Sequence, residues 1–182
     1  MATMSALLRS LLFMALCYYL LAFHPILKTE QQQIHKRNQL IQIASAELGV
    51  REATGNNDGE RVATYLAYTQ LGEGYAWCAA FVSWCYGQAG LSQPRNPWSP
   101  ALFPDARTYC KSSSCSTSNS KSKIAPADVF GIYGQGAKRI IHVGLVQQLD
   151  GNFIHTIEGN SNDRVARKRR HLTTVYTLAN WL

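Results

Sequence analysis

The sequence is short of acidic residues and has no internal repetition. It contains 11 Asp and Glu against 18 Lys and Arg, which gives a formal net charge of +7 over 182 residues. No fixed-period repeat is present, which excludes solenoid and propeller arrays. The excess of positive charge favours an anionic partner, and nucleic acid, anionic lipid and bacterial cell wall all have that character.

Two further absences narrow the choice of function. None of the five cysteines forms a C-x-x-C pair, and their spacing to histidine matches no common zinc-ligand pattern. The sequence also lacks the stacking-aromatic pattern and the reader motifs of nucleic-acid-binding proteins. We therefore predict no metal, no other cofactor and no nucleic-acid partner.

The N-terminus has the pattern of an export signal. Arg9 precedes an apolar run over residues 11–23, and His24 and Pro25 end that run. This arrangement is typical of a secretory signal peptide. The run is short of the roughly 20 apolar residues that cross a bilayer, but an uncleaved inner-membrane anchor over residues 6–27 is the alternative. Both interpretations predict a periplasmic or extracellular location for the rest of the chain.

The remaining length suits one folded domain. A chain of this size can bury one substantial core, and 46% of its residues are hydrophobic. The predicted organisation is a signal peptide or membrane anchor over residues 1–28, a linker over 29–37 and a single domain over 38–182.

Export would allow disulfides to persist among the four cysteines that follow the N-terminal segment. Cys110 and Cys115 bracket a short polar segment, and we predict that they form a disulfide. Cys78 and Cys85 are seven residues apart on one expected helix, about 10 Å along its axis, which is too far for a bond between them. Both are therefore expected to remain free thiols.

The hydrophobic pattern changes from helical to strand-like along the chain. Helices are predicted over residues 35–48, after a cap at Asp58, and from Cys78 onward. A long polar surface loop is expected over residues 91–125. Strands are predicted over 128–133, 139–149, 152–159 and 164–170, with a hairpin turn at Asp150 and Gly151. Helices followed by an antiparallel sheet indicate an α+β fold.

Three of these predicted helices and strands contain residue types that take part in nucleophilic catalysis. Cys78 stands at an expected helix start, where the free backbone N–H groups and the helix dipole favour the thiolate. His142, inside the strand "RIIHVGLV", could accept its proton. Glu158 and Asn160 are two residues apart near the end of the next strand, and either could orient the imidazole. Taken singly, each residue also fits a structural role: a buried thiol, a half-buried histidine and a turn.

The ordered set "AWCAAFVSW", "HVGLV" and "TIEGN" resembles the CHAP domain, the cysteine, histidine-dependent amidohydrolase/peptidase domain of cell-wall hydrolases. The resemblance covers about residues 38–178. It implies a papain-like fold, with Cys78 as nucleophile, His142 as base and Glu158 as the group that orients the histidine. It makes Asn160 an additional polar residue of the site. Tyr75 and Trp77 flank the nucleophile and are predicted to wall the substrate cleft.

The resemblance implies a peptidoglycan hydrolase that forms a cysteine acyl-enzyme. The scissile amide would lie in the stem peptide, the cross-bridge or the N-acetylmuramoyl-L-alanine linkage. The small size suits a partner such as a secretion, conjugation or phage apparatus. A non-catalytic peptidoglycan-binding module is the alternative. The basic run over residues 167–170 fits either an exposed sheet edge or a contact with anionic wall polymers.

Overall fold

The computed structural model describes the backbone of residues 6–182 and the side chains of Leu12, Met14 and residues 28–182. Residues 1–36 and 37–182 form two separate units. The predicted signal peptide or anchor at residues 1–28 lies outside the described residues in its first five positions and in most of its side chains. Among the described residues, we find no helix with the length and apolar character needed to span a membrane.

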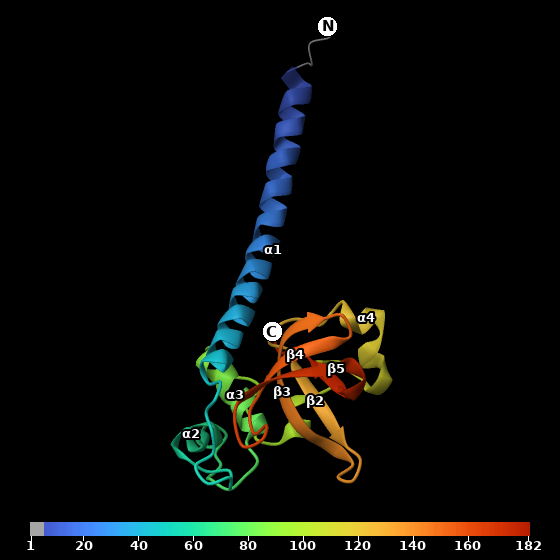
Figure 1. Ribbon diagram of the computed structural model, residues 1–182. Helices are drawn as coiled ribbons and strands as arrows, with labels where there is room; N and C mark the ends of the chain where they lie inside the picture. The colour runs from blue at the N-terminus through green and yellow to red at the C-terminus, as the bar shows by residue number, and fades with distance from the viewer. Residues whose placement is uncertain (1–5) are drawn as a thin grey trace. The chain divides into compact units, whose positions relative to one another are not determined.

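The first helix, α1, spans Ala6–Ala46 (Figure 1). It contains the predicted linker over residues 29–37, which is therefore helical, and most of the helix predicted over 35–48. Leu40 and Ala44 are fully buried, as expected for residues one helical turn apart on one face. The helix is followed by Gly49 at a φ of +89°, a conformation that glycine adopts without steric cost.

Two shorter helices follow, α2 over Glu60–Tyr68 and α3 over Cys78–Gln88. The predicted cap of α2 at Asp58 is wrong, because Gly59 occupies the N-cap position. The Asp58 carboxylate instead accepts hydrogen bonds from the backbone N–H and the hydroxyl of Thr54, at 2.9 and 2.6 Å. Asp58 therefore stabilises the loop that precedes α2, and no side chain caps the helix.

The sheet is antiparallel, has six strands and follows the order β1-β6-β2-β3-β4-β5. Four strands confirm the predicted positions, and the turn that joins β3 to β4 is formed by Gly151 and Asn152, one residue later than predicted. Strands β1 and β6 were not predicted. Both are short, and they pair with each other although they are far apart in the sequence. The bounds are β1 Thr108–Lys111, β2 Val129–Gly134, β3 Arg139–Asp150, β4 Phe153–Glu158, β5 Ala166–His171 and β6 Thr177–Ala179.

The expected loop over residues 91–125 is also wrong in its centre. It contains β1, the 3-10 helices η1 (Ser99–Leu102) and η2 (Ser112–Ser116), and the short helix α4 (Ser118–Lys121). A disulfide joins Cys110 of β1 to Cys115 of η2, with 5.1 Å between their Cα atoms. The serine-rich composition indicated a loop, but pairing of β1 with β6 and this cross-link organise the segment.

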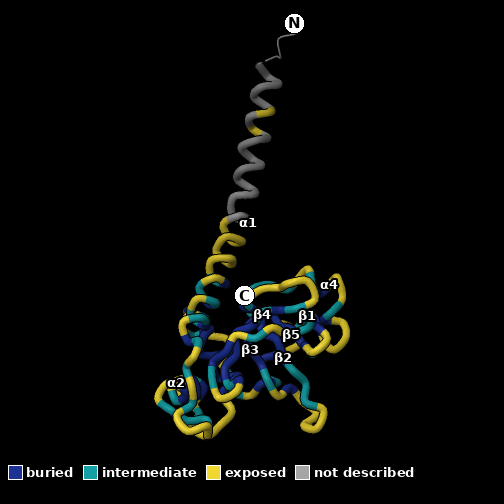
Figure 2. The backbone as a smooth tube through the Cα atoms, in the orientation of Figure 1, coloured by how far each residue is buried: buried dark blue, intermediate teal, exposed yellow. Residues whose placement is uncertain are grey.

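Helix α3 packs on the sheet next to β3 and β4 (Figure 1). All its residues from Cys78 to Tyr86 are buried, and the buried backbone in Figure 2 runs through α3 and the central strands. Close packing depends on Gly159, where a Cβ atom would lie 2.6 Å from the Cβ of Phe81. The nucleophile candidate therefore stands at one end of a helix held firmly against the sheet.

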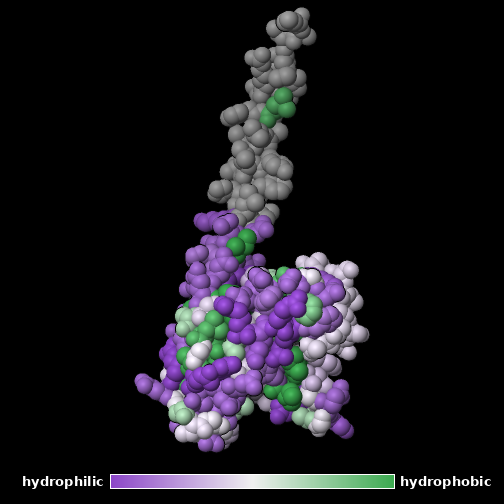
Figure 3. Space-filling model, in the orientation of Figure 1, coloured by the Kyte–Doolittle hydropathy of each residue, from purple (hydrophilic) through white to green (hydrophobic). Residues whose placement is uncertain are grey.

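Within the unit of residues 37–182, a buried ion pair joins Arg37 of α1 to Asp128, which directly precedes β2. Arg37 Nη1 lies 2.9 Å from Asp128 Oδ1, and the two side chains are 10% and 1% exposed. The Tyr109 hydroxyl also donates to Asp128, and Asn180 accepts from Arg37. Hydrophilic side chains cover much of the outer face shown in Figure 3, in contrast to this enclosed pair.

Candidate active site

Cys78 is the first residue of α3. Its thiol is free, the residue is only 4% exposed, and Sγ lies 3.4 Å from the Ser99 hydroxyl. The first backbone N–H groups of a helix have no partner within the helix. The thiol is therefore placed where both the helix dipole and a neighbouring hydroxyl favour a negative charge.

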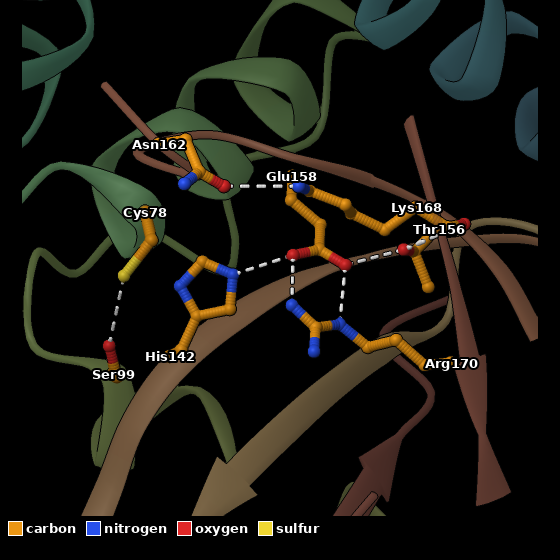
Figure 4. A network of polar contacts seen from close by, with 8 residues as sticks. All are labelled: Cys78, Ser99, His142, Thr156, Glu158, Asn162, Lys168 and Arg170. Atoms are coloured by element: carbon orange, nitrogen blue, oxygen red, sulfur yellow. Dashed lines mark hydrogen bonds and ion pairs between the residues drawn. The ribbon is translucent and has the colours of Figure 1, made fainter. Parts of the chain in front are cut away.

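His142 lies on β3 beside an irregularity in the strand. Ile132 pairs with His142, but the next residue of β2 pairs with Ile140, which leaves Ile141 as an extra residue. Such a bulge bends a strand and redirects its side chains. Ile141 is 46% exposed, whereas the imidazole turns toward the start of α3 (Figure 4).

Glu158 is the last residue of β4 and is fully buried. Its Oε2 lies 2.8 Å from Nε2 of His142. The imidazole ring stands between Glu158 and Cys78, so its other nitrogen, Nδ1, faces the thiol (Figure 4). Three side chains from three different elements thus form one line from sulfur through imidazole to carboxylate.

The pKa shifts in this line favour an ion pair. Burial raises the pKa of the Cys78 thiol, but the interactions with His142 and Ser99 outweigh burial and lower it below the usual value. Burial lowers the pKa of His142, but its interactions with Cys78 and Glu158 raise it to about 9. A lowered thiol pKa beside a raised imidazole pKa favours a thiolate and an imidazolium, and the thiolate is the nucleophilic form of cysteine.

Comparison with known families identifies the domain. A family model described as the CHAP domain matches residues 70–160, which is half of the chain. The chain belongs to the CHAP family. CHAP domains are generally cysteine- and histidine-dependent peptidoglycan hydrolases or amidases. The match and the helices-then-sheet architecture confirm the predicted family and the α+β papain-like fold.

A search of curated proteins found no match. Among the described residues, we also find no group of three or more His, Cys, Asp and Glu side chains arranged to hold a metal ion.

Arg170 on β5 is part of the site, and the sequence analysis missed it. Its guanidinium donates to both carboxylate oxygens of Glu158, from Nε at 2.6 Å and from Nη2 at 2.5 Å (Figure 4). The Thr156 hydroxyl donates to the same carboxylate. Burial raises the pKa of Glu158, but Arg170 and His142 outweigh it and lower the pKa to about 2. The CHAP domain therefore holds this carboxylate ionised.

The register of the sheet explains why Arg170 reaches the site. Glu158 pairs with Ala166, and alternate strand residues share a face, so Lys168 and Arg170 lie on the same face as Glu158. Arg167 lies on the opposite face and is exposed. The basic run lies on the edge strand β5, which is one of its two predicted placements, but the contact of Arg170 with Glu158 could be found only from the strand pairing.

Asn160 is placed differently from the prediction. β4 ends at Glu158, and Asn160 has a φ of +53°, so the two residues do not share a strand face. Its amide donates to Oδ1 of Asn57 at 2.9 Å. Among the described contacts, Asn160 therefore links the turn after β4 to the loop before α2 and makes no hydrogen bond to His142.

The two predicted cleft aromatics have different roles. Trp77 is fully buried, its indole N–H donates to Glu52, and its ring stacks on Tyr65, so the prediction that it walls the cleft is wrong. Tyr75 is 58% exposed and lines a hollow of about 310 Å³ that contains Cys78. Trp98, also 58% exposed, lines the same hollow and was not predicted.

Proposed function

We propose that this CHAP domain is a cysteine peptidase or amidase that cleaves an amide bond of bacterial peptidoglycan. The alignment of Cys78, His142 and Glu158, with Arg170 holding the carboxylate, is the observation that supports the proposal. The scissile bond belongs to the stem peptide, the cross-bridge or the N-acetylmuramoyl-L-alanine linkage. The open hollow beside Cys78 provides the space for an extended peptide.

Acylation begins with attack of the Cys78 thiolate on the amide carbonyl carbon. An S–C bond forms, and the carbonyl oxygen becomes an oxyanion that the backbone N–H groups at the start of α3 can stabilise. Collapse of this intermediate breaks the C–N bond. Nδ1 of His142 gives its proton to the departing amine, so the amine leaves neutral and a thioester remains on Cys78.

Deacylation uses the same groups in the opposite direction. His142, now neutral, takes a proton from water as the oxygen attacks the thioester carbon. The C–S bond then breaks, which releases a carboxylic acid and restores the thiolate and the imidazolium. Glu158 keeps Nε2 of His142 protonated and the ring oriented through both steps, and Arg170 fixes the plane of Glu158 by its two parallel hydrogen bonds.

The proposed location is the periplasm or the cell exterior, where both the substrate and a stable disulfide occur. An inner-membrane anchor over residues 6–27 would keep the enzyme near the wall. A secretion, conjugation or phage apparatus that needs a local opening in the wall is the partner we propose.

The decisive experiment incubates purified peptidoglycan with the full chain and, in parallel, with the Cys78→Ala variant. Mass spectrometry of the soluble fraction should reveal new fragments only with the intact thiol, and their masses identify the bond. If neither protein releases fragments but both sediment with the wall, the protein is a non-catalytic peptidoglycan-binding module and the proposal is wrong.

A further inference from the structure

Arg139 is a charged residue of the hollow beside Cys78 that has no place in the catalytic line. It begins β3 and is exposed, and it borders the hollow together with Tyr75, Trp98 and Ser99. Within the described part of the chain, its side chain makes one hydrogen bond, from Nη1 to the carbonyl oxygen of Ile140 at 3.2 Å. A guanidinium has five N–H donors, so most of them remain open to a ligand.

The charges around the hollow leave Arg139 without compensation. In the catalytic line, the negative charges of the Cys78 thiolate and Glu158 balance the positive charges of His142 and Arg170. None of the residues that line the hollow is acidic. Its remaining net charge is therefore the one positive charge of Arg139, because the other lining residues apart from Cys78 are uncharged.

We infer that Arg139 binds a free carboxylate on the substrate, close to the scissile amide. This inference rests on the proposed function and defines its substrate class: a peptide that carries an unamidated carboxyl group. A planar guanidinium can form two parallel hydrogen bonds to a carboxylate, and this geometry gives both affinity and selectivity. A neutral carboxamide in the same position cannot provide the compensating charge.

The spacing along β3 limits where the carboxylate can lie. Arg139 precedes His142 by three residues, which is at most about 10 Å along a strand, because the extra residue Ile141 shortens this segment. An extended substrate covers about 3.3–3.6 Å per residue, and the arginine side chain covers part of the distance. The recognised carboxylate is therefore within about two residues of the bond that Cys78 attacks.

The test compares two synthetic muropeptides that are identical except that one has free carboxylates and the other has the same groups as carboxamides. The full chain should cleave the carboxylate form at least tenfold more efficiently in kcat/KM. Arg139→Gln should lose this preference by slowing cleavage of the carboxylate form alone. Arg167→Gln, which removes an equal charge from an exposed position on β5 outside the hollow, should retain the preference. Equal cleavage of both muropeptides by the full chain, or a preference that survives in Arg139→Gln, would overturn the inference.

A binding measurement separates this inference from the proposed function. Calorimetry with the Cys78→Ala variant should give a dissociation constant at least tenfold lower for the carboxylate form, and Cys78→Ala combined with Arg139→Gln should remove the difference. If the full chain cleaves neither muropeptide but this difference in binding persists, hydrolysis is refuted and carboxylate recognition stands. If the full chain cleaves both and they bind equally, recognition is refuted and hydrolysis stands.

Discussion

Nε2 of His142 and Oε2 of Glu158 lie 2.8 Å apart, and Arg170 donates hydrogen bonds to both oxygens of the same carboxylate. The histidine is thereby fixed with Nδ1 toward Cys78 (Figure 4). Each side chain in this line depends on the next for its charge and its orientation.

The pH dependence of hydrolysis should be bell-shaped. Activity rises as the Cys78 thiol ionises, at a pH below the usual thiol pKa, and falls as His142 loses its proton near pH 9, to which its pKa is raised. Glu158→Gln removes the carboxylate that stabilises the imidazolium, so the upper limb should move to lower pH. Initial rates between pH 5 and 10 measure both effects. A flat profile would contradict the ion pair.

Iodoacetamide should distinguish Cys78 and Cys85, the two free cysteines among the described side chains. Cys78 is expected to react at a pH below the usual thiol pKa, because its own pKa is lowered and it opens to a surface hollow. Cys85 is expected to remain unmodified, because it is fully buried and burial raises its pKa well above the usual value. Peptide mass spectrometry locates the label. In urea both cysteines should react, and labelling of Cys85 alone in the native protein would refute the assignment.

Replacement of Arg170 should impair both activity and stability. Arg170→Gln leaves the buried Glu158 with fewer donors, and we expect a loss of about 2 kcal/mol in the free energy of unfolding, below the usual cost of breaking a buried pair because Arg170 is partly exposed. The value of kcat should fall at least tenfold because the histidine loses its fixed orientation.

A conservative variant and a control show whether the two parallel hydrogen bonds of Arg170 are needed or only its charge. Arg170→Lys keeps the charge but cannot form two parallel hydrogen bonds, so it should restore stability better than kcat. Arg167→Gln, on the opposite face of β5, should change neither quantity. Denaturant unfolding and initial rates provide both readouts, and wild-type rates in Arg170→Gln would exclude a positioning role.

Gly144 allows β3 to pass close to Glu158. A Cβ atom there would lie 2.9 Å from Cγ of Glu158 and 2.8 Å from the Phe130 ring. Gly144→Ala should therefore destabilise the fold by about 1–3 kcal/mol, as overpacking does, and should lower kcat by displacing the carboxylate. Gly136→Ala is the matched control, because a Cβ atom at that position has no neighbour within 4 Å. Equal effects of the two substitutions in thermal unfolding and activity would contradict this explanation.

The buried ion pair between Arg37 and Asp128 should contribute to stability and leave the chemistry unaffected. Asp128→Asn keeps the shape but removes the negative charge opposite Arg37, which should cost about 3 kcal/mol of unfolding free energy. Asp105→Asn removes an exposed ion pair with Lys111, in which the aspartate side chain is 93% exposed, and should leave the unfolding midpoint unchanged. Denaturant titration of both variants measures the difference, and two equal midpoints would show that the buried pair is dispensable.

The sequence by itself determined the family, the fold class and the order of the three candidate catalytic residues along the chain. Local patterns carried these: a cysteine before a helical run, a histidine inside an apolar strand, and a carboxylate at the end of the next strand. The hairpin between β3 and β4 was likewise visible to within one residue, because its signal lies in adjacent residues. Helix periodicity, strand alternation and turn chemistry all depend on neighbours within a few positions, and a single sequence displays such neighbours directly.

Only the tertiary structure decided which polar groups meet. The register of β4 and β5 places Arg170 beside Glu158. Asn160 lies away from His142 because β4 ends two residues before it. Trp77 is buried by helix packing although its neighbour Tyr75 is exposed, and Arg139 reaches the hollow because β3 borders it. These outcomes depend on pairing and packing between segments far apart in the chain, and no local pattern encodes the position of a distant partner.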